Sequence, residues 1–189
     1  MIKRQNLKHR HITSFQIIIL GFLSVIILGS ILLMLPVATR DGKGAVFSDA
    51  LFTATSAVCV TGLVIHDTAT YWSMFGQSVI LFLIQIGGMG VVTLAVSVAA
   101  VSGRKIGLMQ RSTMQEAVCA HHVGGIVRLT KFILKITVCI ELIGAALLLP
   151  AFIRDFGMLR GIWYALFHSI SAFCNAGFDL IGVKEPFSS

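Results

Sequence analysis

The sequence predicts an all-α integral membrane protein built from repeats of helix, pore loop and helix. Three observations support this fold class: long stretches without charge, an uneven distribution of Lys and Arg, and an internal repeat. Hydrophobic residues make up 56% of the 189 residues and charged residues only 12%, whereas about a quarter of the residues in a soluble domain are charged. The lipid bilayer is therefore the expected surroundings of most of the chain.

Three apolar stretches are candidates for membrane-spanning helices. The first two contain no charged side chain and the third contains only Glu141; they cover residues 12–39, 68–103 and 136–153. A spanning helix needs about 20 mainly apolar residues, which the first two stretches hold in full. We therefore predict spanning helices near residues 15–36, 72–100 and 129–150.

The charges separate by the predicted side of the membrane. The amino terminus and segment 102–135 together carry ten Lys and Arg residues and one acid, Glu116, whereas segments 36–71 and 150–189 carry five basic and six acidic residues. Cytoplasmic segments of membrane proteins are enriched in Lys and Arg. The amino terminus and the loop after residue 102 are therefore expected in the cytoplasm, and the net charge of +7 needs no nucleic acid to explain it.

The residue types that support enzymatic or metal chemistry do not form a recognisable pattern. The four cysteines lack metal-ligand spacing and are predicted on different sides of the membrane, so no disulfide framework is expected. Paired carboxylates, a nucleophile triad and a phosphate-binding loop are also missing from any credible setting. We expect neither an enzyme nor a bound cofactor.

The chain contains an internal repeat. The segment LPVATRD at 35–41 aligns with LPAFIRD at 149–155, and residues 50–63 align with 165–178 at almost the same offset. In the longer block Ala, Leu, Phe, Ser, Ala, Cys and Gly recur in the same order. Each copy is predicted to contain a spanning helix that ends at a proline, a short charged link, a short apolar helix and a glycine-containing stretch.

The two short helices, near residues 48–58 and 162–173, have too few residues to cross a bilayer and are predicted to be re-entrant. The glycine stretch after each one is non-helical, and such backbone is tolerated at membrane depth only where it is buried in protein or lines a watery path. The negative end of each short helix would favour a cation. Glycine allows successive carbonyls to turn toward one axis, so this arrangement predicts a weak cation site of the kind that potassium filters form.

At these residues the sequence resembles the membrane subunit of bacterial Trk/Ktr potassium uptake systems, most closely the Ktr-type translocating subunit. The matching stretches are DALFTATSAVCVTGL at 49–63, FGQ at 75–77, LIQIGGMG at 83–90, GRKIGL at 103–108 and LFHSISAFCNAGF at 166–178. The resemblance implies four potassium-channel-like repeats with one filter glycine each, here Gly62 and Gly177. The carbonyl contributors that it implies are Val60, Thr61, Gly62, Leu63, Asn175, Ala176, Gly177 and Phe178. Glycine rather than serine at position 62 resembles the potassium-preferring members.

The resemblance also implies the setting of the protein. Potassium is the expected transported ion, with sodium as a candidate stimulating ion. The expected partners are the lipid of a bacterial plasma membrane, a second copy of the full-length subunit and a cytosolic nucleotide-binding ring that gates the pore. The chain would supply one and a half of four repeats, so a fragment is expected. Its predicted parts are a cytoplasmic amino terminus at 1–14, a first repeat at 15–101, a cytoplasmic loop at 102–128 and an incomplete second repeat at 129–189.

Two other functions remain open at the level of sequence: a truncated, non-conducting chain that only associates with complete subunits, and a sodium-preferring pore. Several residues also have two interpretations. Glu141 is expected to form a buried hydrogen bond with a group on another helix. Asp67 and Asp179 either concentrate cations at the outer mouth or cap local structure, and His66 adds a titratable group there. Gly87, Gly88 and Gly90 are better explained by close helix packing than by flexibility.

Overall fold

The computed structural model describes residues 14–90 and 126–183, and the predicted amino-terminal segment and most of the predicted cytoplasmic loop lie outside these ranges. Regular structure in the described part is helical: α1 (Ser14–Leu33), η1 (Pro36–Ala38), α2 (Phe47–Val58), α3 (Thr68–Tyr71), α4 (Met74–Met89), α7 (Ile126–Phe156), α8 (Met158–Phe173) and η2 (Ile181–Val183). One isolated β-bridge joins Thr39 to Trp72. The prediction of helical structure is confirmed for residues 14–90 and 126–183.

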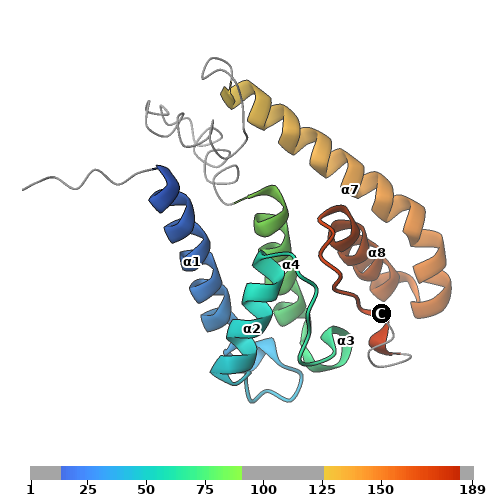
Figure 1. Ribbon diagram of the computed structural model, residues 1–189. Helices are drawn as coiled ribbons and strands as arrows, with labels where there is room; N and C mark the ends of the chain where they lie inside the picture. Colours follow the sequence, from blue (N-terminus) through green and yellow to red (C-terminus); the bar gives the residue numbers. More distant parts are fainter. Residues whose placement is uncertain (1–13, 91–125, 184–189) are drawn as a thin grey trace, which may run out of the picture.

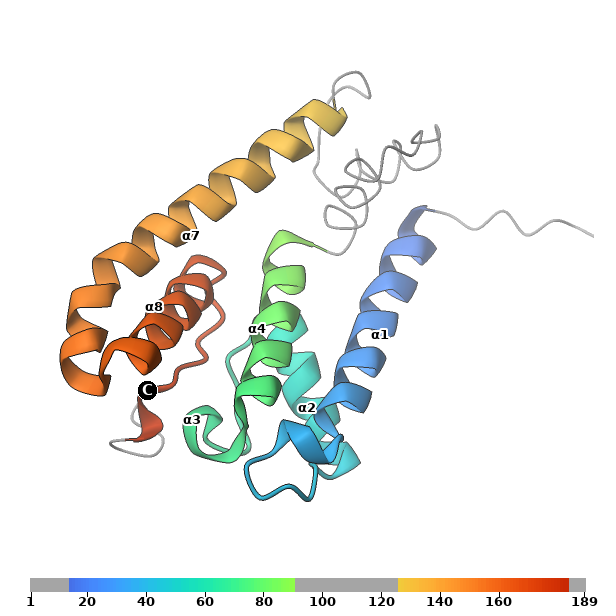
Figure 2. The same cartoon turned by 180° about the vertical axis from the view of Figure 1, so that it is seen from behind.

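The helices form two groups that correspond to the two copies of the repeat. In the first group α2 packs against both α1 and α4, and in the second group α8 packs against α7. Helix α4 also contacts α8, so it connects the groups. Figures 1 and 2 show α8 between α4 and α7 from opposite sides of the molecule.

Helix α7 contains the segment Phe132–Phe156, which is long and apolar enough to cross a membrane by length and composition. The apolar helices Ile18–Leu33 and Met74–Met89 are shorter. Large hydrophobic side chains are exposed along α1 and α7, including Leu28 and Leu147. Contiguous exposed apolar surface of this kind is typical of contact with lipid or with another protein surface.

The structure corrects the predicted boundaries of the second copy. Its long helix was expected to end at Pro150 and to be followed by a charged link, but α7 continues through Pro150 to Phe156. A proline inside a helix removes one backbone hydrogen bond, and helices in membranes tolerate this loss when neighbouring groups compensate. Helix α7 ends instead at Gly157, whose φ of +80° allows a sharp turn. Helix α8 therefore begins at Met158 rather than near residue 162.

The core of the first group lies where α2, α4 and the α3 turn meet. Its largest fully buried side chains include Trp72, Ile80 and Ile84. Ser73 begins α4 because its hydroxyl oxygen accepts a hydrogen bond from the backbone of Gly76 at 3.2 Å. The same hydroxyl donates to the Val37 carbonyl at 2.5 Å. The start of α4 is thus fixed to the segment that follows α1.

Candidate functional site

Two loops with the same unusual backbone follow α2 and α8; we call residues 59–65 and 174–180 the first and second glycine loops. In the first loop φ is +56° at Val60 and +73° at Gly62, and in the second it is +57° at Asn175 and +73° at Gly177. Val60 and Asn175 are the non-glycine residues with positive φ in the described part of the chain. A positive φ is uncommon for any residue with a side chain and is an outlier for a β-branched one. Its occurrence at matched positions shows that the two copies share this backbone conformation.

Hydrogen bonds at the carboxyl end of α2 explain the positive φ of Val60. The Val60 amide donates to the Ala57 carbonyl at 3.3 Å, and the Thr61 amide donates to the Ser56 carbonyl at 3.0 Å. These two bonds form a Schellman motif, which places the residue after the helix cap in the left-handed region. The carbonyls of Ser56 and Ala57, near the end of α2, are thereby satisfied.

The second copy has the same pair of bonds. The Asn175 amide donates to the Ala172 carbonyl at 3.0 Å, and the Ala176 amide donates to the Ser171 carbonyl at 2.7 Å. Asparagine adopts the left-handed conformation more readily than valine does. The common backbone is therefore imposed by the helix ends and not by the residue type at this position.

Left-handed residues alternate with ordinary ones in both loops, because Thr61 and Ala176 do not have positive φ. In a regular extended strand successive carbonyls point to opposite sides. A left-handed conformation at every second residue reverses that alternation, so successive carbonyls can face the same side. This backbone is suited to presenting a row of carbonyl oxygens to one ligand.

The two glycine loops meet at their glycines. A Cβ atom built on Gly62 would lie 2.7 Å from the Ala176 carbonyl oxygen and 3.2 Å from the Gly177 Cα. A Cβ atom on Gly177 would lie 3.3 Å from the Gly62 Cα. The structure thus brings together the two glycines that the repeat alignment paired, and a side chain at position 62 would collide with the neighbouring loop.

Equivalent serines attach each glycine loop to its helix. In the first copy Thr61 Oγ1 donates to Ser56 Oγ at 3.0 Å. In the second copy Ser171 Oγ donates to the Phe178 carbonyl at 2.6 Å. The Phe178 carbonyl therefore faces α8. Among the predicted carbonyl contributors it is the one that already accepts a hydrogen bond in the described part of the chain.

Adjacent glycines of α4 support both loops from one side. A Cβ atom on Gly87 would collide with the Val58 carbonyl at the end of α2, and one on Gly88 would lie 2.5 Å from Cys174 Sγ at the end of α8. Gly90 has φ of +78° and caps α4. These distances agree with the packing interpretation of Gly87 and Gly88. They explain how one helix can contact the ends of α2 and α8 at once.

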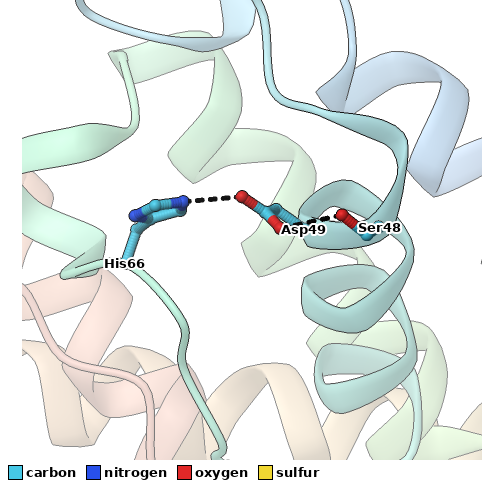
Figure 3. Close-up of polar contacts among 3 residues, drawn as sticks. All are labelled: Ser48, Asp49 and His66. Carbon is cyan, nitrogen blue, oxygen red and sulfur yellow. Dashed lines mark hydrogen bonds and ion pairs between the residues drawn. The ribbon is translucent and has the colours of Figure 1, made fainter.

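Just after the first loop, His66 Nε2 lies 2.8 Å from Asp49 Oδ2, and Ser48 Oγ donates to Asp49 Oδ1 at 3.0 Å (Figure 3). The His66 ring stacks on Tyr71, with ring centroids 4.0 Å apart. The hydrogen bond with His66, followed by that with Ser48, lowers the pKa of the Asp49 carboxyl. Asp49 also lies in the first turn of α2, where a negative charge is favoured by the helix dipole.

The other two predicted outer carboxylates make capping contacts. Asp67 is the N-cap of α3, and its Oδ1 accepts from the Thr70 amide and from the Thr70 hydroxyl, each at 2.9 Å. Asp179 Oδ1 accepts from the Ile181 amide at 2.8 Å. Both carboxylates therefore have a local structural role, and attraction of cations by them stays a prediction.

Sequence reasoning identified Glu141 but not its partner. Glu141 is only 5% exposed, and its Oε1 accepts from Gln85 Nε2 on α4 at 2.7 Å. Its backbone carbonyl accepts from Ser169 Oγ on α8 at 2.6 Å. Gln85 Oε1 is buried and has no hydrogen-bond partner within the described residues. The signal that could have identified Gln85 is a polar side chain inside an apolar helix.

Gln77, also on α4, is a second polar contact between the copies that sequence reasoning missed. Its Oε1 accepts from Trp163 Nε1 on α8 at 2.9 Å, and its Nε2 donates to the Trp72 carbonyl at 3.2 Å. Gln77 is 2% exposed. The two glutamines of α4 thus connect the first group of helices to the second, and both lie on the amino-terminal side of Gly87 and Gly88.

The chain is similar to known cation transport proteins over most of its length. The family model TrkH, described as cation transport protein, matches residues 2–184. The potassium/sodium uptake protein NtpJ of Enterococcus hirae is 44% identical over 173 residues, which cover 92% of this chain and 38% of that protein. The Ktr system potassium uptake protein B of Bacillus subtilis is 44% identical over 178 residues, which cover 94% and 40%, and its namesake from Vibrio alginolyticus is 40% identical over 180 residues. The chain thus spans about two fifths of the length of these relatives.

Proposed function

Because the chain belongs to the TrkH family of cation transport proteins, we propose that it forms part of a potassium-selective pathway across a bacterial plasma membrane. The observation that carries this proposal is the matched backbone of the two glycine loops, with positive φ at Val60 and Gly62 and again at Asn175 and Gly177. Two adjacent loops with this conformation can present carbonyl oxygens to a dehydrated cation.

The proposed mechanism is the exchange of water for backbone oxygen, without covalent chemistry. The ion sheds hydration water as carbonyls of 60–63 and 175–177 replace it. These carbonyls accept no hydrogen bond from the described residues, so binding an ion breaks none. The carboxyl ends of α2 and α8 lie next to the loops, and their negative dipole ends favour a cation.

The alternating backbone is costly, and the surrounding contacts hold it in place. Residues in sparsely populated regions of φ and ψ cost about 1–3 kcal/mol each. The Schellman bonds, the serines of α2 and α8, and Gly87 and Gly88 of α4 all restrain the loops. A loop that already has the binding conformation loses little further conformational entropy when it binds the ion.

The setting is part of the same proposal. We assign this chain to a Ktr-type uptake system in which further loops complete the ring of carbonyls. The full-length subunit would pair with a second copy and with a cytosolic nucleotide-binding ring, and its amino terminus would lie in the cytoplasm. The Lys and Arg asymmetry supports that orientation, and the exposed apolar faces of α1 and α7 support contact with lipid.

Rubidium uptake into potassium-starved cells that lack their own uptake systems tests the proposal. The chain is expressed alone and as its natural gene product, and sodium is added as a competitor. Saturable rubidium uptake that excess sodium does not suppress supports the potassium pathway. Uptake that sodium outcompetes supports the sodium-preferring alternative. Uptake by a natural longer form, with no uptake from this chain alone although it reaches the membrane, supports an association role.

Gly62→Ser tests the assignment of the loop itself. The added Cβ would lie 2.7 Å from the Ala176 carbonyl oxygen, so both loops must shift and selectivity should fall by about tenfold, equivalent to about 1.4 kcal/mol. Gly42→Ser is the matched control, because Gly42 has φ of +70° but nothing within 4 Å of its Cβ position. Equal selectivity in the two variants would contradict the assigned loop.

A further inference from the structure

His168 on α8 has both ring nitrogens engaged, and its partners determine where its hydrogen lies. Nδ1 is 2.8 Å from the Tyr164 carbonyl oxygen, which can only accept, so Nδ1 must carry the hydrogen. Nε2 is 3.2 Å from the Leu180 amide, which can only donate, so Nε2 must be bare. The two contacts together require a neutral imidazole with its hydrogen on Nδ1.

The surroundings of the ring hold this orientation. Phe152 of α7 stacks on it, with centroids 4.8 Å apart and planes at 30°, and Phe167 meets it at 67°. The titratable group that faces it from the second glycine loop is Asp179, whose carboxylate accepts from the Ile181 amide. Its own helix contributes the Tyr164 carbonyl, and α7 contributes aromatic carbon.

The contact lies where the second glycine loop ends. Leu180 is fully buried, so its amide depends on a protein acceptor. Phe178 lies two residues before Leu180, and its carbonyl accepts a hydrogen bond from Ser171 Oγ at 2.6 Å. Helix α8 therefore holds its loop at two successive points. The first copy has no such contact from its helix at the aligned position, because Thr53 stands where the second copy has His168.

We propose that His168 is a positioning residue, which sets the carbonyls of residues 175–177 by accepting the Leu180 amide at Nε2. This inference rests on the proposed function. A protonated ring, or one with its hydrogen on Nε2, would face the Leu180 amide with a second donor and release the end of the loop. The second glycine loop then loses one of its two attachments to α8.

Two variants of the natural full-length protein, reconstituted in liposomes, test the role in transport. His168→Phe keeps the stacked ring and removes the acceptor, whereas His168→Gln places an amide oxygen near the position of Nε2. We expect rubidium-over-sodium selectivity to fall roughly tenfold in the first variant, about one net hydrogen bond, and to be largely retained in the second. Equal selectivity in wild type and His168→Phe overturns the inference.

A second measurement is independent of transport and is made on the wild-type protein. Nitrogen-15 NMR of the histidine-labelled wild-type protein at neutral pH, with the His168→Gln spectrum subtracted for assignment, should show a neutral ring with its hydrogen on Nδ1. A charged ring or one with its hydrogen on Nε2 overturns the inference. Wild-type protein that transports no rubidium refutes the proposed function instead, so the two failures are distinguishable.

Discussion

His66 Nε2 lies 2.8 Å from Asp49 Oδ2, so a residue beyond the first glycine loop is joined to the first turn of the helix that precedes it (Figure 3). In the second copy the histidine is on the other side of the contact: His168 belongs to the helix, and it accepts from Leu180 at the end of the loop. The two histidines do not align in the repeat. Each copy therefore ties its loop to its helix through an imidazole at a different position.

The contact between Asp49 and His66 should make stability depend on acidity. Hydrogen bonds with His66 and then Ser48 lower the pKa of Asp49 below the usual value of an aspartate. A carboxyl with a depressed folded-state pKa contributes stability above its unfolded pKa, and this is lost as the pH falls through the folded value. We expect Asp49→Asn to flatten the fall in melting temperature between about pH 5 and about pH 3, measured by differential scanning fluorimetry in detergent.

Asp41→Asn is the matched control for Asp49→Asn. Contacts with Thr39 and Lys43 also lower the pKa of Asp41, but Asp41 lies in the link between α1 and α2. Asp41→Asn should reduce the fall in melting temperature at low pH without changing rubidium-over-sodium selectivity. Asp49→Asn is expected to change both quantities. Identical melting temperatures for wild type and Asp49→Asn at the higher pH would show that the contact with His66 adds no stability.

Glu141 and Gln85 form a buried pair between α7 and α4, and their contribution can be separated by substitution. Glu141→Gln keeps an acceptor for Gln85 and should be close to wild type in stability. Glu141→Leu leaves the Gln85 amide without its partner and should cost about 1–3 kcal/mol. The double variant Gln85→Leu with Glu141→Leu should recover most of that loss, because no buried polar group is then unpaired.

Chemical denaturation in detergent measures these differences, with the helical circular dichroism signal as the readout. A double variant less stable than Glu141→Leu alone would mean that the pair contributes more than mutual satisfaction of polar groups. That outcome would point to a contribution of the Gln85 side chain beyond its hydrogen bond with Glu141.

Gly87 and Gly88 are adjacent in α4, but a second substitution, Cys174→Gly, should restore the stability lost on alanine substitution only at Gly88. Gly88→Ala would place Cβ 2.5 Å from Cys174 Sγ and 2.8 Å from its Cβ, so Cys174→Gly should restore most of the stability that Gly88→Ala removes. Gly87→Ala collides with the backbone of Val58, which no side-chain substitution can relieve. Overpacking of this kind costs about 1–3 kcal/mol.

The comparison uses melting temperature and rubidium uptake of four proteins: each alanine variant with and without Cys174→Gly. Recovery is expected for Gly88→Ala only. Recovery of both, or of neither, would indicate that α4 does not contact the ends of α2 and α8 separately.

Much of the fold could be predicted because it depends on local pattern. The short helix expected at residues 48–58 is observed at Phe47–Val58, and the repeat alignment paired Gly62 with Gly177. The continuation of α7 through Pro150 could not be predicted from the repeat, because tolerance of a helical proline depends on surrounding contacts. The contact between the two glycines is long-range and leaves no local signal.

The hydrogen-bond partners of the buried polar residues could not be predicted from the sequence either. Apolar context predicted that Glu141 would bond to another helix, but several polar side chains could have served. Only the packing of both α7 and α4 against α8 selects Gln85. The role of His168 depends on which ring nitrogen meets which backbone group. That relationship depends on how α8 and the end of its loop are placed in three dimensions.

Ser171 provides the last test, because its hydroxyl holds the Phe178 carbonyl at 2.6 Å. Ser171→Ala releases this carbonyl, and we expect rubidium-over-sodium selectivity to fall about three- to tenfold, in line with the loss of one hydrogen bond. Ser78→Ala is the matched control, since its hydroxyl donates to the Met74 carbonyl at 2.7 Å on the exposed side of α4. Competition of sodium against rubidium in liposomes gives the measurement. If Ser171→Ala retains wild-type selectivity, the Phe178 carbonyl is not restrained for the sake of the ion.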